Sequence, residues 1–283
     1  MFSDEEMFSL FATLVTIFTF TSKEELQEAV DMWCDEKTRE EAEEKYGNIS
    51  DWDVSQITDM SGLFAGKDFF NDDISRWDVS NVTNMENMFK GACSFNQPIN
   101  TWNVSKVSSM SCVFKNANEF NQPLDKWNTK SVVDMSGMFL GAKSFNQPIN
   151  TKILYPIYDT FYIAWNVSKV TSMSCMFKNA NEFNQPLDKW NTKSVVDMSG
   201  MFLGAKSFNQ PINTKRTYCF FYHTNYMAWK VTKVTFMKEM FRNASKFNQS
   251  IRSWDVENVV DMCSMFYGAK RMEKPKKPSL MNL

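Results

Sequence analysis

The amino-acid sequence predicts an α/β repeat solenoid of eight stacked coils, each about 25 residues long, with a helical cap at its N-terminal end. Three observations support this fold class. Tryptophan recurs at a nearly constant spacing, the apolar positions between tryptophans recur with it, and a capped helical pattern precedes the first repeat. We therefore divide the chain into an N-terminal segment (1–47), a repeat array (48–269) and a basic tail (270–283).

The N-terminal segment is expected to contain two helices. Ser22 and Glu25 have the spacing of a capping box, which marks the start of a helix. The apolar residues that follow share one helical face: Leu26, Ala29, Val30 and Trp33. A second helical stretch covers residues 38–46 and stops at Gly47. An element with one apolar face and a polar back suits the exposed end of a solenoid, so we expect this pair to cap the array.

An apolar stretch from Met7 to Phe20 precedes these helices. It is too short to cross a bilayer, which needs about 20 residues, so we expect no transmembrane span. Acidic residues precede the stretch, whereas a secretory signal carries Lys or Arg there. The stretch therefore either covers the first coil or serves in targeting. The basic tail at the other end of the chain is expected to be a solvated end rather than a nucleic-acid-binding segment.

Tryptophan marks the register of the repeat. It stands at positions 52, 77, 102, 127, 165, 190, 229 and 254, and only Trp33 lies outside this series. Five of the seven spacings are 25 residues, and the other two are 38 and 39. A fixed period this short is typical of a solenoid, in which each repeat contacts only its neighbours.

One repeat shows how each coil is expected to fold. After Trp77, the apolar positions of the second repeat are Val79, Val82, Met85, Met88, Phe89, Ala92, Phe95 and Ile99. The spacing between Met85 and Ala92 predicts a short helix or 3₁₀ segment. Pro98 ends any helix, so residues 94–100 are expected to be extended. Each coil is thus predicted to contain a short extended piece, a turn and a short helical piece.

An asparagine follows the second phenylalanine of almost every coil. These residues are Asn71, Asn96, Asn121, Asn146, Asn184, Asn209 and Asn248. A buried asparagine can bond the backbone of neighbouring coils, because its amide both donates and accepts. We expect a structural ladder along the array rather than a ligand-binding row.

Two inserts, residues 152–164 and 215–228, interrupt the period. Each follows Ile-Asn-Thr, ends in Ala-Trp and is rich in aromatic residues. Because the entropy of loop closure grows slowly with length, we expect Thr151 to stay close to Trp165 and Thr214 close to Trp229. The aromatic residues indicate one of two things. Either they form a surface for a partner, or each insert is noncoding sequence that was wrongly translated into the chain.

The strings WDVSNVTNMENMF, MFKGACSFNQPIN and WDVENVVDMCSMF resemble the BspA-like leucine-rich-repeat surface proteins, and the likeness covers residues from about 48 to 269. The resemblance implies a leucine-rich-repeat-like, right-handed stack. It also implies surface display and adhesion, as in many bacterial members of that family. The inserts and the lack of a convincing signal peptide depart from this pattern, so a cytoplasmic location is the alternative to the cell surface.

The sequence contains no recognisable catalytic or metal-binding constellation. His223 is the single histidine and lies in an insert, and no phosphate-binding glycine motif occurs. Asp59, Asp134, Asp197 and Asp261 share one repeat position, where turn aspartates are expected rather than a calcium row. The cysteines form no Cys-x-x-Cys pair and are expected to be free, and Cys112 and Cys175 to be buried thiols.

These observations favour a non-enzymatic scaffold that binds a protein or surface ligand and needs no cofactor. A structural surface or secreted protein without a specific ligand is the alternative. An enzyme that uses the aromatic inserts as a pocket is a third hypothesis. The sequence predicts no nucleic-acid partner.

Overall fold

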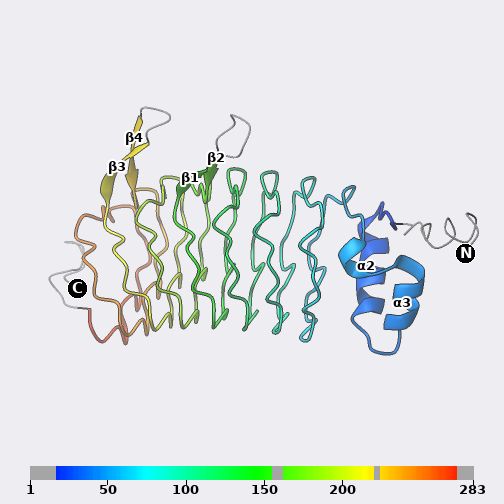
Figure 1. Cartoon of the computed structure of the whole chain (residues 1–283). Helices are drawn as coiled ribbons and strands as arrows, with labels where there is room; N and C mark the ends of the chain where they lie inside the picture. Colours follow the sequence, from blue (N-terminus) through cyan, green and yellow to red (C-terminus); the bar gives the residue numbers. More distant parts are fainter. Residues whose placement is uncertain (1–16, 155–161, 220–223, 273–283) are drawn as a thin grey trace, which may run out of the picture.

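A computed structural model of the chain describes residues 17–154, 162–219 and 224–272. Figure 1 shows a row of coils that lie side by side along one axis, with two helices at the N-terminal end of the row. The helices are α2 (Lys23–Trp33) and α3 (Arg39–Tyr46), and a short 3₁₀ helix, η1 (Ile49–Asp51), leads into the first coil. Within the described residues, no helix is both long enough and apolar enough to cross a membrane.

Both N-terminal helices form where the sequence predicts them. The Ser22 hydroxyl accepts a hydrogen bond from the Glu25 N–H at 3.2 Å, which caps the start of α2. The Glu25 carboxylate accepts from the N–H of Thr21 rather than that of Ser22, so only one arm of the predicted capping box forms. Helix α3 ends before Gly47, whose positive φ of 75° is one that glycine adopts readily.

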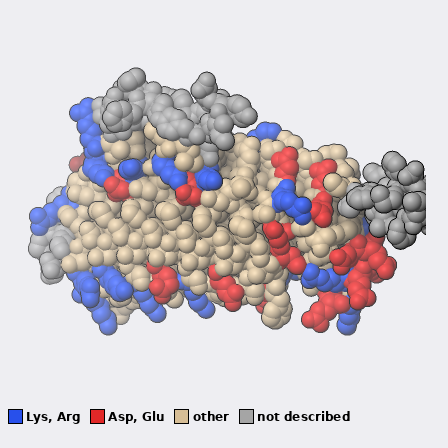
Figure 2. Space-filling view, in the orientation of Figure 1, with Lys and Arg blue, Asp and Glu red and all other residues tan. Residues whose placement is uncertain are grey.

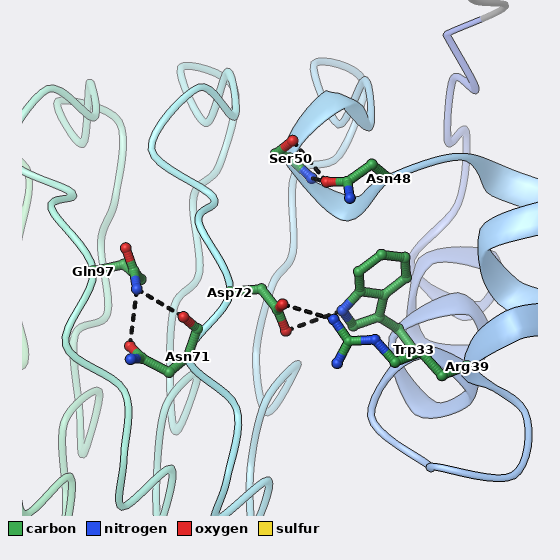
Figure 3. Close-up of polar contacts among 7 residues, drawn as sticks. All are labelled: Trp33, Arg39, Asn48, Ser50, Asn71, Asp72 and Gln97. Atoms are coloured by element: carbon green, nitrogen blue, oxygen red, sulfur yellow. Dashed lines mark hydrogen bonds and ion pairs between the residues drawn. The ribbon is translucent and has the colours of Figure 1, made fainter.

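The helix pair is attached to the first coils by apolar packing and by polar contacts (Figure 3). The predicted face of α2 is buried, including Trp33. The Trp33 indole donates to Asp72 at 3.1 Å, and Arg39 donates to the other oxygen of the same carboxylate at 2.7 Å. Phe20, the last residue of the apolar stretch, packs against Trp52. Residues 7–16 of that stretch lie outside the described residues.

Parallel bridges connect each coil to the next. They link residues 59, 84, 109, 134, 172, 197, 236 and 261 in chain order. Each contact joins equivalent positions of adjacent repeats, and the pairs Asp134–Ser172 and Asp197–Phe236 span the inserts. The register of the coils is therefore the same before and after each insert.

The short helix or 3₁₀ segment predicted between Met85 and Ala92 does not form. This segment forms isolated turns, in which Met88 N–H bonds the Met85 carbonyl and Ala92 N–H bonds that of Phe89. The alternate N–H groups bond the next coil instead: Asn87 bonds the Ser111 carbonyl and Phe89 that of Val113. A helix would direct every N–H along its own axis, so stacking replaces half of the local hydrogen bonds with bonds between coils.

The left-handed backbone positions of each coil explain why these turns do not become a helix. Asn87 has φ 56° and Gly91 has φ 75°, and the same two positions of the next coil, Cys112 and Asn116, have φ 56° and 59°. Such conformations interrupt a right-handed helix. At the second position, glycine and asparagine are the residues that accept positive φ most readily.

The core consists of columns of identical side chains that run along the stack. Phe89 stacks on Phe64 at 5.3 Å and on Phe114 at 5.7 Å between ring centroids, with interplanar angles of 3° and 1°. The tryptophans lie inside the array, and Trp127, Trp165, Trp190 and Trp229 are completely buried. Each coil thus buries the apolar side chains of its neighbours, so a single repeat depends on the adjacent repeats for its core.

The inserts, expected as loops, form two antiparallel hairpins at their bases. Strand β1 (Lys152–Leu154) pairs with β2 (Tyr162–Ala164), and β3 (Lys215–Cys219) pairs with β4 (Thr224–Ala228). Both hairpins leave the same edge of the stack (Figure 1), which we call the hairpin edge. These strands were not predicted from the sequence, because each is short and the aromatic residues follow no clear alternation.

Candidate interaction surface

The repeated asparagines form a continuous hydrogen-bonded series. The Oδ1 atom of Asn71 accepts from the N–H of Asn96 at 2.9 Å, and each later asparagine bonds the next in the same way as far as Asn248. The bonds across the inserts, Asn146 to Asn184 and Asn209 to Asn248, are as short as the others. We expected these side chains to be buried. They are instead at least half-exposed along one face of the coils.

Glutamine supplies a second contact to the same ladder, which the sequence analysis missed. Gln97 Nε2 donates to the backbone carbonyl of Asn71 at 2.7 Å and to its Oδ1 at 3.1 Å (Figure 3). Gln185 and Gln210 make the same pair of bonds to Asn146 and Asn184. The Asn-Gln dipeptide recurs in the sequence, so this role could have been proposed from the repeat itself.

The tryptophans also have a polar role that their apolar pattern does not reveal. The indole N–H of Trp102 donates to the carbonyl of Ile74 at 3.3 Å, and that of Trp165 donates to Leu124 at 2.8 Å. Each bond reaches back to the preceding coil and satisfies a buried carbonyl. Trp77, Trp127, Trp190, Trp229 and Trp254 form equivalent bonds. The column thus combines packing with a second hydrogen-bond ladder.

Each hairpin is fixed at its base by the same three side chains. Lys152 at the start of β1 forms a salt bridge with Asp125, and Asn100 donates to the other carboxylate oxygen of Asp125 at 2.7 Å. Lys215, Asp188 and Asn150 repeat this arrangement at the second hairpin. Burial raises the pKa of the Asp125 carboxyl, but the bonds from Lys152 and Asn100 outweigh it and hold the pKa below its usual value.

The residues on either side of each hairpin remain in contact, as the sequence predicts. The Thr151 hydroxyl donates to the Trp165 carbonyl at 2.9 Å, and Thr214 donates to Trp229 at 2.8 Å. Both tryptophans have φ 51°, whereas no tryptophan at an uninterrupted junction has a positive φ. The hairpin is therefore accommodated by a left-handed conformation at one bulky residue, which is unfavourable for the backbone.

Only part of the aromatic content of the inserts can be placed. The hydroxyl of Tyr226, on β4, donates to the Lys189 carbonyl at 2.6 Å and so holds the second hairpin against the neighbouring coil. Met227 beside it is 40% exposed. His223 and the central aromatic residues of both inserts lie outside the described residues.

The repeated aspartates act as turn residues. Asp59, Asp134, Asp197 and Asp261 each accept a hydrogen bond from the N–H two residues further on, at 2.8 to 2.9 Å. Within residues 17–154, 162–219 and 224–272, no group of three His, Cys, Asp or Glu side chains is placed to hold a metal ion.

The described cysteines with placed side chains, Cys34, Cys93, Cys112, Cys175 and Cys263, are free. Cys112 and Cys175 are half-buried rather than buried, because they occupy a left-handed turn position near the surface. Burial raises the pKa of the Cys34 thiol to about 11, with a smaller opposing effect from Lys67. Cys34 therefore stays protonated at neutral pH and is a poor nucleophile.

The comparisons with known proteins identify a family but no function. The family described as "Mycoplasma protein of unknown function, DUF285" matches residues 20–152 and 159–278, and the chain belongs to this repeat-containing family. The two matched segments meet at the first insert. No curated protein and no solved structure shows significant similarity to the chain.

Proposed function

We propose that the chain is a non-enzymatic repeat scaffold that binds a protein partner or a surface ligand. The observation that carries the proposal is the hairpin edge, where two hairpins leave one side of the stack and are fixed by the same Asn–Asp–Lys arrangement. Identical anchoring of both hairpins supports a role in presenting them to a partner. An extended array that presents repeated elements on one side suits binding over a long surface.

We also propose a more specific fold and a more specific family relationship for the chain. The parallel bridges and the short repeat support a right-handed, leucine-rich-repeat-like solenoid of eight coils, and the repeated motifs support a relationship to the BspA-like surface proteins. We propose the cell surface or the extracellular space as its location, with the cytoplasm as the alternative. A secretion assay with an epitope on the intact chain distinguishes these locations.

A deletion that leaves the coils intact tests the scaffold proposal. Removing residues 152–164 and 215–228 joins Ile-Asn-Thr directly to Trp at both sites, which recreates the uninterrupted junction of residues 99–102. In cells that produce the intact or the shortened chain, crosslinking should link Lys152 and Lys215 of the intact chain to a partner. The partner should be lost from the shortened chain while its folding is retained.

Two outcomes contradict the proposal. If the shortened chain keeps the same crosslinked partners, the hairpin edge is not the binding surface. If neither chain acquires a partner, the protein is better described as a structural component without a specific ligand. Turnover of a substrate that the hairpin deletion abolished would favour the third hypothesis, an enzyme with its pocket at the inserts.

A further inference from the structure

A row of exposed lysines follows the tryptophans of the coils. Figure 2 shows Lys and Arg side chains along the stack, and Asp and Glu gathered at its N-terminal end. The row comprises Lys106, Lys130, Lys169, Lys193, Lys230 and Lys233, which are all exposed and belong to five consecutive coils. We call these residues the lysine row. They lie in or next to the turn that follows each tryptophan, one to four residues after it.

Local structure places these lysines in solvent. In the third coil the N–H of Val107 bonds the carbonyl of Val104 at 3.0 Å, so Lys106 occupies the centre of a four-residue turn. Val104 and Val107 are buried and hold both ends of the turn in the core. The same bond closes the turns 129–132, 167–170, 192–195 and 231–234. Buried ends and an exposed centre leave the ammonium groups free to meet a ligand.

The turns of neighbouring coils are in direct contact. Ser131 Oγ donates to the Ser105 carbonyl at 2.7 Å, and Ser194 Oγ makes the equivalent bond to Ser168. Because stacked strands lie about 4.8 Å apart, five coils place the row over roughly 19 Å. The lysines therefore form a linear series of positive charges on a rigid support.

These charges are not neutralised by neighbouring side chains. The salt bridges among the described residues involve other cations: Lys23, Arg39, Lys45, Lys67, Arg76, Lys152, Lys215 and Arg242. Lys106 has one polar partner, the neutral Oδ1 of Asn81 at 2.7 Å. Asp134 and Asp197 are the acids nearest along the chain to Lys130 and Lys193, and their Oδ1 atoms accept backbone N–H groups of their own turns.

At the position directly after the tryptophan, the coils that carry the lysine row lack the aspartate that the other coils have. Asp53, Asp78 and Asp255 accept a backbone N–H two residues later in the first, second and last coils. The four coils from the third to the sixth make the same turn with asparagine: Asn103, Asn128, Asn166 and Asn191. The seventh coil carries Lys230 there. Asparagine keeps the turn and removes the charge, so the lysine row has acidic boundaries on both sides.

We propose that the lysine row binds a linear anionic polysaccharide, a chain of sugars that carry sulfate or phosphate groups. One or two lysines in each of five stacked coils suit a chain of repeated anionic groups, and the asparagine amides can donate to sugar hydroxyls. The five turns contain no aromatic residue, whereas single-stranded nucleic acids bind largely by stacking their bases on aromatic side chains. None of the six lysines belongs to a hairpin strand.

Binding of a fluorescent heparin oligosaccharide to the full chain tests the proposal. Replacing all six lysines of the row by glutamine should weaken binding at least about tenfold and make it less dependent on salt, because fewer counterions are released. The matched control replaces six lysines elsewhere on the coils by glutamine, with the same change in net charge: Lys90, Lys115, Lys143, Lys178, Lys206 and Lys246. The control should bind within about threefold of the unmodified chain.

A conservative variant keeps the test valid if the sixfold change prevents folding. Asn103→Asp, Asn128→Asp, Asn166→Asp and Asn191→Asp together preserve the turns, since aspartate makes them in other coils, and should weaken heparin binding with an unchanged urea midpoint. An equal loss in the lysine control would show a nonspecific charge effect and overturn the proposal, as would the absence of binding. Tighter binding of a single- or double-stranded oligonucleotide of matched length would overturn the choice of polysaccharide. The hairpin-deleted chain should bind heparin normally, which separates this proposal from the scaffold proposal.

Discussion

Two junctions of the array have the same sequence and different structures. Residues 99–102 and the residues that flank the first hairpin both read Ile-Asn-Thr-Trp, but 13 residues separate Thr151 from Trp165. The stack registers are equal on both sides, and Trp165 is as well buried as Trp102. The difference lies in the backbone: Trp165 has φ 51° and its N–H bonds the Trp127 carbonyl, whereas the N–H of Trp102 bonds that of Ile99. The hairpin edge therefore tolerates a long insertion, and at this junction Trp165 alone adopts the unfavourable left-handed backbone conformation.

The largest expected effect is shared by both junctions. Trp102→Ala and Trp165→Ala should each reduce the free energy of unfolding by about 3–5 kcal/mol, because each removes a buried tryptophan and its bond to the preceding coil. Urea titration followed by far-UV circular dichroism measures the loss. Trp102→Phe is the control that keeps an aromatic ring. A loss below about 1 kcal/mol for either alanine variant would contradict the buried column.

Deleting the hairpins separates the two junctions. Without residues 152–164, Trp165 can return to the extended backbone of Trp102, which relieves about 1–2 kcal/mol of left-handed strain. The salt bridge between Lys152 and Asp125 is lost, but exposed pairs contribute little. We expect the shortened chain to unfold at the same or a higher urea concentration. Unfolding of the array on deletion would show that the hairpin is part of the core.

The asparagine ladder tests whether the stack is continuous across an insert. Asn121→Ala removes a bond within the regular stack, and Asn146→Ala removes the equivalent bond to Asn184 across the first hairpin. Each leaves a backbone N–H without its partner, so both should cost about 1 kcal/mol. Equal losses in thermal unfolding would confirm equivalent coupling. A loss at Asn121 alone would mean that the insert decouples its neighbours.

The smallest expected effect concerns pH. Burial raises the pKa values of Asp125 and Asp188, but the hydrogen bonds from a lysine and an asparagine, with the attraction to nearby lysines, together outweigh it and lower both. A carboxylate with a lowered folded-state pKa stabilises the fold above its unfolded pKa of about 3.9, and this stability is lost as the pH falls through the folded-state value. Because the pairs are partly exposed, each should contribute less than about 1 kcal/mol.

The pH effect can be assigned to the hairpin bases. Stability measured by urea titration between pH 7 and pH 3 should fall less in the double variant Asp125→Asn and Asp188→Asn than in the unmodified chain. Asp73→Asn is a suitable control, since its pKa is also lowered but by the backbone and side chain of Ser75, away from the hairpins. The control should retain the pH dependence of the hairpin bases.

The sequence by itself determined the period, the buried columns, the start of α2 and the end of α3. Trp77, Phe89 and Phe95 recur in register, and burial requires large apolar side chains at the same position of each coil. Ser22 and Gly47 mark helix ends by local hydrogen bonding and by positive φ, which depend on few neighbours. The contact of Thr151 with Trp165 also followed from the sequence, since the repeat resumes in phase after the insert.

Only the tertiary structure decided the local backbone of the coils and the position of their polar groups. The spacing of apolar residues from Met85 to Ala92 is compatible with a helix. The N–H groups of Asn87 and Phe89 instead donate to the next coil, and this cannot be inferred from one repeat alone. The indole bond of Trp102 and the bond of Lys152 to Asp125 likewise join residues about one coil apart. Periodicity reports which side chains are buried, whereas the direction of each N–H depends on the neighbouring coil. The fold of this protein is fixed by contacts between repeats.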